Sequence, residues 1–346
     1  MDLFPLRLGV PVKILGKPSL KSHDARRSQS EPHLRVSLGY LSDIFDYLAS
    51  HGIHMYRMSS DLAPYATHPD MPMFHSMVRE SASDLAAIGK KARDLGLRLS
   101  FHPSQFIVLN SPDPDLVRKS VWDLTSQAEM LYLMELGPEA VLVVHVGGVY
   151  DDKERARARW IETWPSLPEP VRRRLVLEND DLRFSCADVL HIHEHTGVRL
   201  IFDHQHFWCL NPEMLSMRDT LAKMLASWPD GVRPKVHFSS PRTELRQLTR
   251  KNLKTKKSEV VNVAPIWTGH ADFVNPFEFA TFMRTALALD FDVMLEAKSK
   301  DLALIRLRAD LVRYAPDVAD RFGLVPALQD KLDAEGADLM EADPAA

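Results

Sequence analysis

Short apolar segments recur along this chain, and six of them end on a histidine or a carboxylate. Runs of four to six residues rich in Val, Leu and Ile are typical of buried parallel strands. The residues that close these runs are His102, His145, Glu178, Asp203, His237 and Glu296, and His206 follows Asp203 after three residues. Side chains at the carboxyl ends of parallel strands meet where a β/α barrel builds its active site. The pattern therefore indicates a metal-containing barrel enzyme.

Strand-like and helix-like segments alternate eight times. The expected strands are Leu6–Val10, Ile53–Met58, Leu97–Phe101, Val141–His145, Arg174–Glu178, Val198–Asp203, Pro234–Phe238 and Phe291–Glu296. Amphipathic stretches lie between them, among them Leu38–Ser50, Ser81–Leu95, Asp115–Leu136 and Asn275–Leu289. Eight such units predict an α/β fold of the (β/α)8 TIM-barrel type, which needs about 250 residues. The 346 residues suffice for one such domain.

Three regions depart from this alternation. Residues 14–34 form a polar insertion after the first strand, and residues 241–265 form a second insertion after the seventh. The second insertion carries six basic residues between Arg246 and Lys257. We expect the barrel domain to span residues 1–324 and the acidic, Ala-rich residues 325–346 to be a disordered tail.

Several protein classes are disfavoured by composition. We find no apolar stretch near 18 residues, as a transmembrane helix would need, and no secretory signal pattern at the start. The two cysteines, Cys186 and Cys209, form no CxxC motif and are expected to be reduced thiols of a cytoplasmic protein. The formal charge of −4 leaves room for a local basic face.

Each candidate ligand also has a simpler explanation. A strand-end carboxylate such as Glu178 could form a salt bridge inside the barrel mouth, and a single histidine could belong to the core. Imidazole and carboxylate together suit zinc, manganese or iron, and seven such groups exceed the need of one ion. His204 should face away from Asp203, because adjacent strand residues point to opposite sides. The histidines at 191, 193 and 195 are attributed to a helix end before Gly197, where positive charge is favourable.

Several motifs together resemble the UV damage endonucleases. They are HPSQF at 102–106, VVHVGG at 143–148, LEND at 177–180, FDHQH at 202–206, PKVH at 234–237, GHADF at 269–273 and VMLEAK at 293–298. The resemblance implies a barrel related to endonuclease IV and a cluster of divalent ions. It also implies cleavage of double-stranded DNA immediately 5′ to cyclobutane pyrimidine dimers, 6-4 photoproducts and some abasic sites.

The resemblance further implies roles for single residues. His102, His145 and Glu178 would hold one ion, and Glu178 would bridge to a second. The second ion would be completed by Asp203, His237 and Glu296, and a third would be held by His206 and His270. Lys235 matches a lysine that can be carboxylated in the family, and Glu178, Lys235, His237 and Glu296 would be the catalytic group. The expected metal is Mn²⁺, with Zn²⁺ as an alternative, and paired ions would activate a water-derived hydroxide for attack on phosphorus.

Recognition of damage is expected outside the ion cluster. The resemblance implies that the side chains of Gln105 and Phe106 insert into the duplex, where such insertion stabilises kinked DNA. The alternative is that Phe106 is an aromatic residue of the hydrophobic core. Arg57 is a candidate phosphate contact. Val10 stands where some relatives have a lesion-probing tyrosine. The basic run from Arg246 to Lys257 is either a backbone track or a solvated loop.

Two other functions share parts of this pattern. A sugar isomerase or epimerase barrel also presents Glu, Asp and His at strand ends, but the extra histidines indicate more ions than those enzymes use. A non-catalytic damage-binding protein would be expected to have lost some ligands. We therefore expect a DNA endonuclease that acts as a monomer without a membrane partner.

Overall fold

The fold is built on eight parallel strands in two sheets. The computed structural model describes residues 5–150, 152–252 and 254–324. The strands are β1 (Leu8–Pro11), β2 (Met55–Arg57), β3 (Arg98–Ser100), β4 (Leu142–His145), β5 (Leu175–Glu178), β6 (Arg199–Ile201), β7 (Lys235–Phe238) and β12 (Asp292–Leu295). Their order is β3-β2-β1-β12-β7 in one sheet and β4-β5-β6 in the other. Isolated parallel bridges join Phe101 to Leu142 and Asp203 to His237, linking the two sheets at both edges.

Alternation along the strands separates two cores. Leu142, Leu175 and Leu200 face the main hydrophobic core under the helices, whereas Val143 and Val176 belong to a smaller cluster on the other face. Because the side-chain period of a strand is two, residues two positions further along the second face also point inward. This inner face leads directly to His145 and Glu178, which are paired across β4 and β5. The strand period thus directs the predicted ligands inward.

The inner face is tightly filled below the ligands. A Cβ on Gly9 would lie 2.7 Å from Cγ of Met55 and 3.0 Å from Cε of Met294, so only glycine fits there. At the amino end of the strands, Arg98 donates to Asp292 at 2.8 Å, with both side chains buried. The charged centre at the carboxyl end therefore rests on a packed interior.

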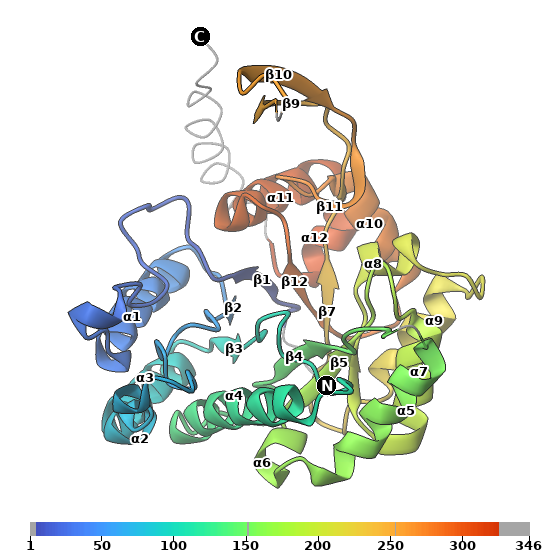
Figure 1. Cartoon of the computed structure of the whole chain (residues 1–346). Coiled ribbons are helices and arrows are strands. Elements are labelled where there is room, and N and C mark those ends of the chain that lie inside the picture. Colours follow the sequence, from blue (N-terminus) through green and yellow to red (C-terminus); the bar gives the residue numbers. More distant parts are fainter. Residues whose placement is uncertain (1–4, 151, 253, 325–346) are drawn as a thin grey trace.

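Helices surround the strands (Figure 1). The longer ones are α1 (Leu34–Ser50), α3 (Ala82–Asp94), α4 (Pro114–Leu133), α5 (Lys153–Thr163), α7 (Cys186–Thr196), α9 (Met217–Leu225), α10 (Pro276–Thr285) and α11 (Lys300–Tyr314). Short helices are α2 (Met77–Glu80), α6 (Glu169–Arg172), α8 (His204–Cys209) and α12 (Pro316–Arg321). The four amphipathic stretches named from the sequence correspond to α1, α3, α4 and α10, and the eight expected strands are all present with shorter bounds.

The two insertions have defined structures. Residues 14–33 form a loop with a 3-10 turn, η1 (Ser28–Ser30). Asp24 in this loop is buried, and its backbone N–H donates to Ser37 Oγ at 2.9 Å. The second insertion contains β8 (Pro241–Arg242) and an antiparallel hairpin of β9 (Arg246–Lys251) and β10 (Ser258–Val263). Strand β11 (Ile266–His270) follows it and pairs with β8. The hairpin projects from the helices and strands (Figure 1). Strand periodicity did not indicate it because most of its residues are exposed and neither face is apolar.

Two other expectations concern the chain as a whole. Among the described residues, no helix is both long and apolar enough to cross a membrane. Cys186 and Cys209 are free thiols. The acidic tail expected over residues 325–346 lies outside the described residues.

Candidate metal centre

Three groups of potential ligands meet at the carboxyl ends of the inner strand faces. The groups are His102, His145 and Glu178; Glu178, Asp203 and His206; and Asp203, His237 and Glu296. Within each group, one ligand atom from every residue lies within 4.8 Å of the others. Glu178 and Asp203 each belong to two groups, so the three groups form one continuous cluster.

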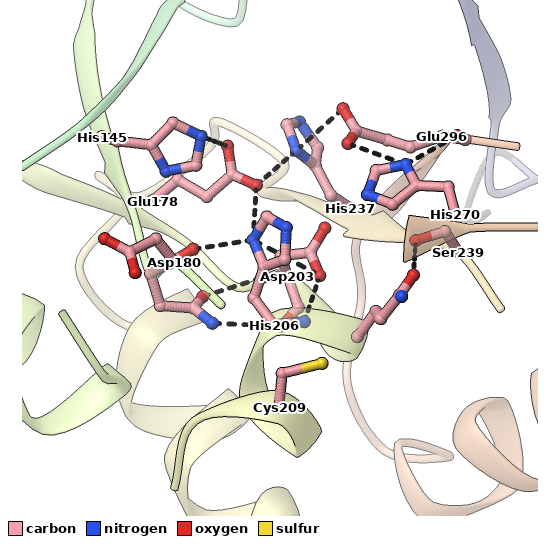
Figure 2. Close-up of polar contacts among 12 residues, drawn as sticks. His145, Glu178, Asp180, Asp203, His206, Cys209, His237, Ser239, His270 and Glu296 are labelled. Atoms are coloured by element: carbon pink, nitrogen blue, oxygen red, sulfur yellow. Dashed lines mark hydrogen bonds and ion pairs between the residues drawn. The ribbon is translucent and has the colours of Figure 1, made fainter. Parts of the chain in front are cut away.

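Glu178 lies at the middle of this cluster. Its Oε1 accepts a hydrogen bond from His237 Nδ1 at 2.9 Å, and His206 Nδ1 lies 3.6 Å from the same oxygen. Its Oε2 lies 3.3 Å from His102 Nε2 and 3.8 Å from His145 Nε2. Figure 2 shows His145 of β4, His237 of β7 and His206 of helix α8 directed at this carboxylate. A carboxylate that has histidine nitrogens near both of its oxygens is suited to bridge two cations.

The turn after β6 brings two further ligands together. Asp203 is the N-cap of α8, and its Oδ1 accepts from the backbone N–H of His206 at 2.7 Å. Aspartate is favoured at this position because it satisfies a free backbone donor. The cap begins the helix that turns His206 back over Asp203, with 3.7 Å between Nδ1 and Oδ1.

Backbone carbonyls orient three of the imidazoles. The Nδ1–H of His102 donates to the carbonyl oxygen of Pro103 at 3.1 Å. In the same way, His206 donates to the carbonyl of Asn179 at 2.9 Å, and His270 donates to the carbonyl of Glu296 at 2.9 Å. A carbonyl oxygen only accepts, so in a neutral ring the Nε2 lone pair is left free. This arrangement prepares a histidine to ligate a metal.

His270 occupies the edge of the cluster. Its ring centroid lies 6.1 Å from that of His206, and its Nδ1 lies 3.9 Å from Glu296 Oε2. It belongs to none of the three groups formed by the described residues, while His206 groups with Glu178 and Asp203. The structure thus brings the predicted third pair to the same mouth, with His270 as the more distant member.

Charge is unevenly shared among the buried carboxylates. Burial acts to raise the pKa of Glu178, but the charges of His237 and His145, the nearby ring of His102 and the hydrogen bond from His237 outweigh it, leaving that pKa well below its ordinary value. Burial raises the pKa of Asp203, and nearby Glu178 and Glu296 add to the rise against the opposing charge of His206. Burial opposes protonation of His206, yet Asp203, Glu178 and Glu296 raise its pKa to about 9. The three carboxylates of the cluster therefore differ in how readily each keeps its charge.

Buried atoms without hydrogen bonds test whether metal ions fit. Glu178 Oε2, Asp203 Oδ2, His237 Nε2 and His145 Nδ1 are buried and make no hydrogen bond within the described part of the chain. Leaving a buried polar atom unsatisfied costs about 1–3 kcal/mol, and more when it is charged. Buried carboxylates with unsatisfied oxygens and imidazole nitrogens without hydrogen bonds match the donor set that divalent ions bind. The residues present fit a metal cluster.

Arg57 and Lys235 contribute positive groups next to the cluster. Arg57, at the end of β2, forms an ion pair with Glu296 through Nη1 and Oε1. Burial works against the charged form of Glu296, but Arg57 and His237 outweigh it and lower its pKa. Lys235 is fully buried two residues before His237 and donates to Ser100 Oγ at 2.9 Å. Burial, together with Arg98 and Arg57, holds the pKa of Lys235 well below its usual value.

The expected recognition residues lie around the mouth. Gln105 and Phe106 are exposed in the loop after β3, and 73% of Phe106 is accessible, which removes the core-aromatic explanation. Val10, in contrast, is fully buried in the main core. Val12 is the nearby residue that lines a cavity of about 350 Å³, whose walls also include His23, Arg57 and His102.

The remaining histidine expectations are confirmed. His204 faces away from the cluster and stacks on Phe238 with 4.5 Å between ring centroids. The histidines at 191, 193 and 195 lie in the last two turns of α7, which ends at Gly197 with φ +72°, and none joins a ligand group of the described chain. Their place near a helix end is as expected.

Sequence reasoning missed the residues that hold the ligands in place. Asn179 accepts from Asp203 N at 2.9 Å and donates to Asp203 O at 3.2 Å, tying the end of β5 to the end of β6. Gln205 accepts from Ser239 Oγ and donates to Trp267 O at 2.8 Å, joining α8 to β7 and β11. The only available signal was the position of Asn179 and Gln205 directly beside the ligands Glu178 and His206.

Comparison with known proteins supports one family. Residues 25–321 match the model of the family described as UV-endonuclease UvdE. The UV DNA damage endonucleases of Bacillus velezensis and Bacillus pumilus are 34% and 35% identical over 272 and 269 residues, which are 77% of this chain and 77% of each relative.

Solved structures distinguish family from fold. The crystal structure of SacUVDE is similar with a TM-score of 0.74 and 29% identity, covering 89% of this chain and 98% of that one. A putative sugar phosphate isomerase/epimerase from Anabaena variabilis has a TM-score of 0.51 at 11% identity, covering 95% and 88%, which shows a shared fold alone. The match of the family model over most of the chain decides the assignment: this chain belongs to the UV-endonuclease UvdE family.

Proposed function

We propose that this protein is a DNA repair endonuclease that nicks the phosphodiester immediately 5′ to UV photoproducts in double-stranded DNA. The proposed lesions are cyclobutane pyrimidine dimers and 6-4 photoproducts, together with abasic sites. The observation that carries the proposal is the cluster of three ligand groups sharing Glu178 and Asp203, in a member of a UV-endonuclease family. Resemblance to the isomerases is limited to the fold, at 11% identity.

The proposed cofactor is a cluster of up to three divalent ions, with Mn²⁺ as the first choice and Zn²⁺ as the alternative. His102, His145 and Glu178 would hold one ion, and Glu178, Asp203, His237 and Glu296 the second. His206 and His270 would belong to the third. Bound ions supply a water of lowered pKa and neutralise charge that develops on the phosphate.

The chain's own residues would position the substrate. His237 is hydrogen-bonded to Glu178 and lies 3.4 Å from Glu296 Oε1, and this buried group would hold the ligand atoms in place. The Arg57 guanidinium beside Glu296 lies close enough to the cluster to contact a non-bridging phosphate oxygen, since guanidinium binds phosphate well. Lys235, buried behind His237, is proposed to be carboxylated, which would convert its amine to an additional anionic group facing the ions.

Damage recognition is assigned to the loop after β3. Gln105 and Phe106 are proposed to enter the duplex at the lesion, because an exposed aromatic can stack on bases that the lesion leaves weakly paired. The cavity of about 350 Å³ lined by Val12, His23 and Arg57 would receive the displaced lesion. With Val10 buried, this cavity lacks an aromatic side chain from that strand position.

We further propose that β1–β7 and β12 form a closed (β/α)8 barrel in one domain covering residues 1–324. The two parallel bridges at both sheet edges support closure. The protein would act as a monomer in the cytoplasm, where Cys186 and Cys209 stay reduced.

The decisive experiment is incubation of the full chain with UV-irradiated and undamaged duplex oligonucleotides in the presence of Mn²⁺, followed by mapping of any nick. Cleavage of the irradiated strand alone, at the bond 5′ to the lesion, is the expected result. Isomerisation of a sugar without any nick would contradict it.

A further inference from the structure

A second cavity opens beside the metal centre, on the side away from the Phe106 loop. It has a volume of about 730 Å³ and is lined by aromatic side chains from α8, β11 and α10. Trp208, Trp267 and Phe277 are 63%, 62% and 61% exposed. Three large, accessible aromatic side chains around one cavity are unusual on a protein surface and mark a binding site.

The cavity and the metal centre are built by the same elements. Helix α8 directs His206 to the centre and Trp208 to the cavity, and strand β11 carries His270 toward the centre and Trp267 toward the cavity. Gln205 joins these two elements through its hydrogen bond to Trp267 O at 2.8 Å. Ser239 and Cys209 also line the cavity. Ser239 donates to Gln205, the residue before His206, and Cys209 lies in α8 with His206 (Figure 2). A molecule in the cavity would therefore lie next to the reacting phosphodiester.

The position of Trp208 is also fixed. Its indole N–H donates to His204 Nε2 at 3.1 Å, and His204 in turn stacks on Phe238. The indole is thus held by a hydrogen bond on one edge while most of its surface stays accessible. A preorganised aromatic of this kind loses little entropy when a flat ligand stacks on it.

The residues that line the cavity indicate what kind of flat ligand it takes. Pro241 and Trp267 line the cavity on β8 and β11, and the chain between these strands forms the basic β9–β10 hairpin. Glu278 also lines the cavity and accepts from Ser240 Oγ at 2.6 Å through one carboxylate oxygen. No Lys or Arg is among the lining residues of the described chain, so a ligand there would be held by stacking on the aromatic walls, and every base has a face that can stack.

We propose that this cavity is a nucleobase subsite that takes one unstacked base of the substrate strand next to the cleaved phosphodiester. Trp208 and Trp267 would stack on the base, and the Glu278 carboxylate would accept a hydrogen bond from an exocyclic amino group. The subsite is separate from the Phe106 loop, because β3 and β7 are the two opposite edges of the five-stranded sheet. The inference rests on the proposed action on damaged DNA and adds a second contact that flanks the metal centre.

The test uses duplexes that carry one photodimer and a single fluorescent 2-aminopurine at successive positions on either side of it. Wild type is compared with Trp208→Ala, Trp267→Ala and the double variant, and with Tyr132→Ala as a matched control. Tyr132 is 72% exposed but lines a different cavity, with Arg174 and Arg199. Binding is followed by stopped flow with enzyme in excess, and metal content, circular dichroism and nicking are measured on the same samples.

We expect one labelled position to change its fluorescence on binding to wild type and to the Tyr132 variant, and to lose this change in the double variant. The dissociation constant should rise roughly 5- to 150-fold for each stacked base that is lost. Metal content should be unchanged.

Two outcomes would overturn the inference alone. In the first, wild type nicks damaged DNA, but the double variant binds it with the same affinity and the same fluorescence change as the Tyr132 variant. The other is a loss of affinity that follows a loss of bound metal, which would make the tryptophans supports of the metal centre. If wild type neither bound nor nicked damaged DNA, the proposed function itself would fail, and the subsite with it.

Discussion

The imidazole Nδ1 of His237 lies 2.9 Å from Glu178 Oε1, and both side chains are fully buried although 59 residues separate them. The other atoms of this pair that could bind a cation, His237 Nε2 and Glu178 Oε2, make no hydrogen bond among the described residues. An ion at these atoms would satisfy both. The relationship therefore explains why this polar pair is retained in the interior, and it leads to the first prediction.

Replacing Glu178 by Ala should remove bound metal and lower nicking by roughly 10²–10³-fold or more, the cost of losing one charge-stabilising group in an active site. The fold should survive, because the strands around it are held by the hydrophobic clusters. Metal analysis and a nicking assay check this. His191→Ala is the matched control, since His191 lies in α7 outside the ligand groups of the described residues. Wild-type activity in the Glu178 variant would refute the assignment.

Replacing Gln105 and Phe106 together by Ala should weaken binding to photodimer-containing duplex by about 1–3 kcal/mol per stacked base. Metal occupancy should stay at the wild-type level, because neither side chain belongs to a ligand group. Fluorescence titrations with damaged duplex, alongside metal analysis, measure both effects. Unchanged affinity with reduced metal would show that this loop supports the ions instead.

Neutralising the exposed hairpin cations should weaken binding to damaged and undamaged DNA alike. The residues to change are Arg250, Lys251, Lys254, Lys256 and Lys257. Each phosphate contact that is lost should reduce the slope of log affinity against log salt by about 0.9 on duplex DNA. Titrations at several salt concentrations measure the slope, and turnover at saturating DNA should be preserved.

Arg246 provides the control for the hairpin. It is half-buried and pairs with Asp272 at 2.8 Å, so its charge is already balanced. Arg246→Gln should change the slope less than neutralisation of an exposed lysine such as Lys256. An unchanged slope after all five substitutions would make the hairpin a solvated insertion and direct attention to residues 14–34.

The Asp24 carboxylate should make stability depend on pH in the acid range. The pKa of Asp24 is lowered to about 2, mainly because its carboxylate accepts a hydrogen bond from the Arg26 side chain. Burial opposes this shift, and hydrogen bonds from the backbone N–H groups of His33 and Arg26 add to it. Because the folded pKa is depressed, the stabilisation is full above the unfolded pKa of about 4 and is lost as pH falls from there toward 2.

Asp24→Asn should therefore lower the free energy of unfolding by about 1 kcal/mol at pH 7, a modest value because Arg26 is half-exposed and water screens the pair. The difference from wild type should shrink between pH 4 and pH 2. Denaturant unfolding at several pH values measures it. A difference that stays constant across this range would contradict the role of the charge.

Much of the site could be predicted before the structure because strand periodicity is local. Glu178 follows Val176 on the inner face, and His145 follows Val143, so a period of two directs both ligands to the carboxyl end of that face. His204 faces away from the cluster as expected, but as the first residue of helix α8 and not through strand alternation. Helix bounds were also local, since α3 is followed directly by Leu95 and Gly96 at its carboxyl end.

The exposed hairpin shows where this reasoning ends. With most residues of β9 and β10 accessible and no apolar face, their sequence carries no periodic signal, and pairing across the turn alone defines them. Val10 likewise lies at a strand end in the sequence, but its neighbours bury it and leave Val12 to line the cavity.

By itself, then, the sequence determined the alternation of strands and helices, the chemical type of the ligands and the end of the strands where they gather. The tertiary structure decided which candidate ligands lie within reach of one another, because grouping depends on strand order and register. It placed His206 with Glu178 and Asp203 while leaving His270 at the edge. It also brought Trp208 and Trp267, 59 positions later, to one cavity that no local pattern encodes, since distances between elements far apart in the sequence are set by the packing of the whole chain.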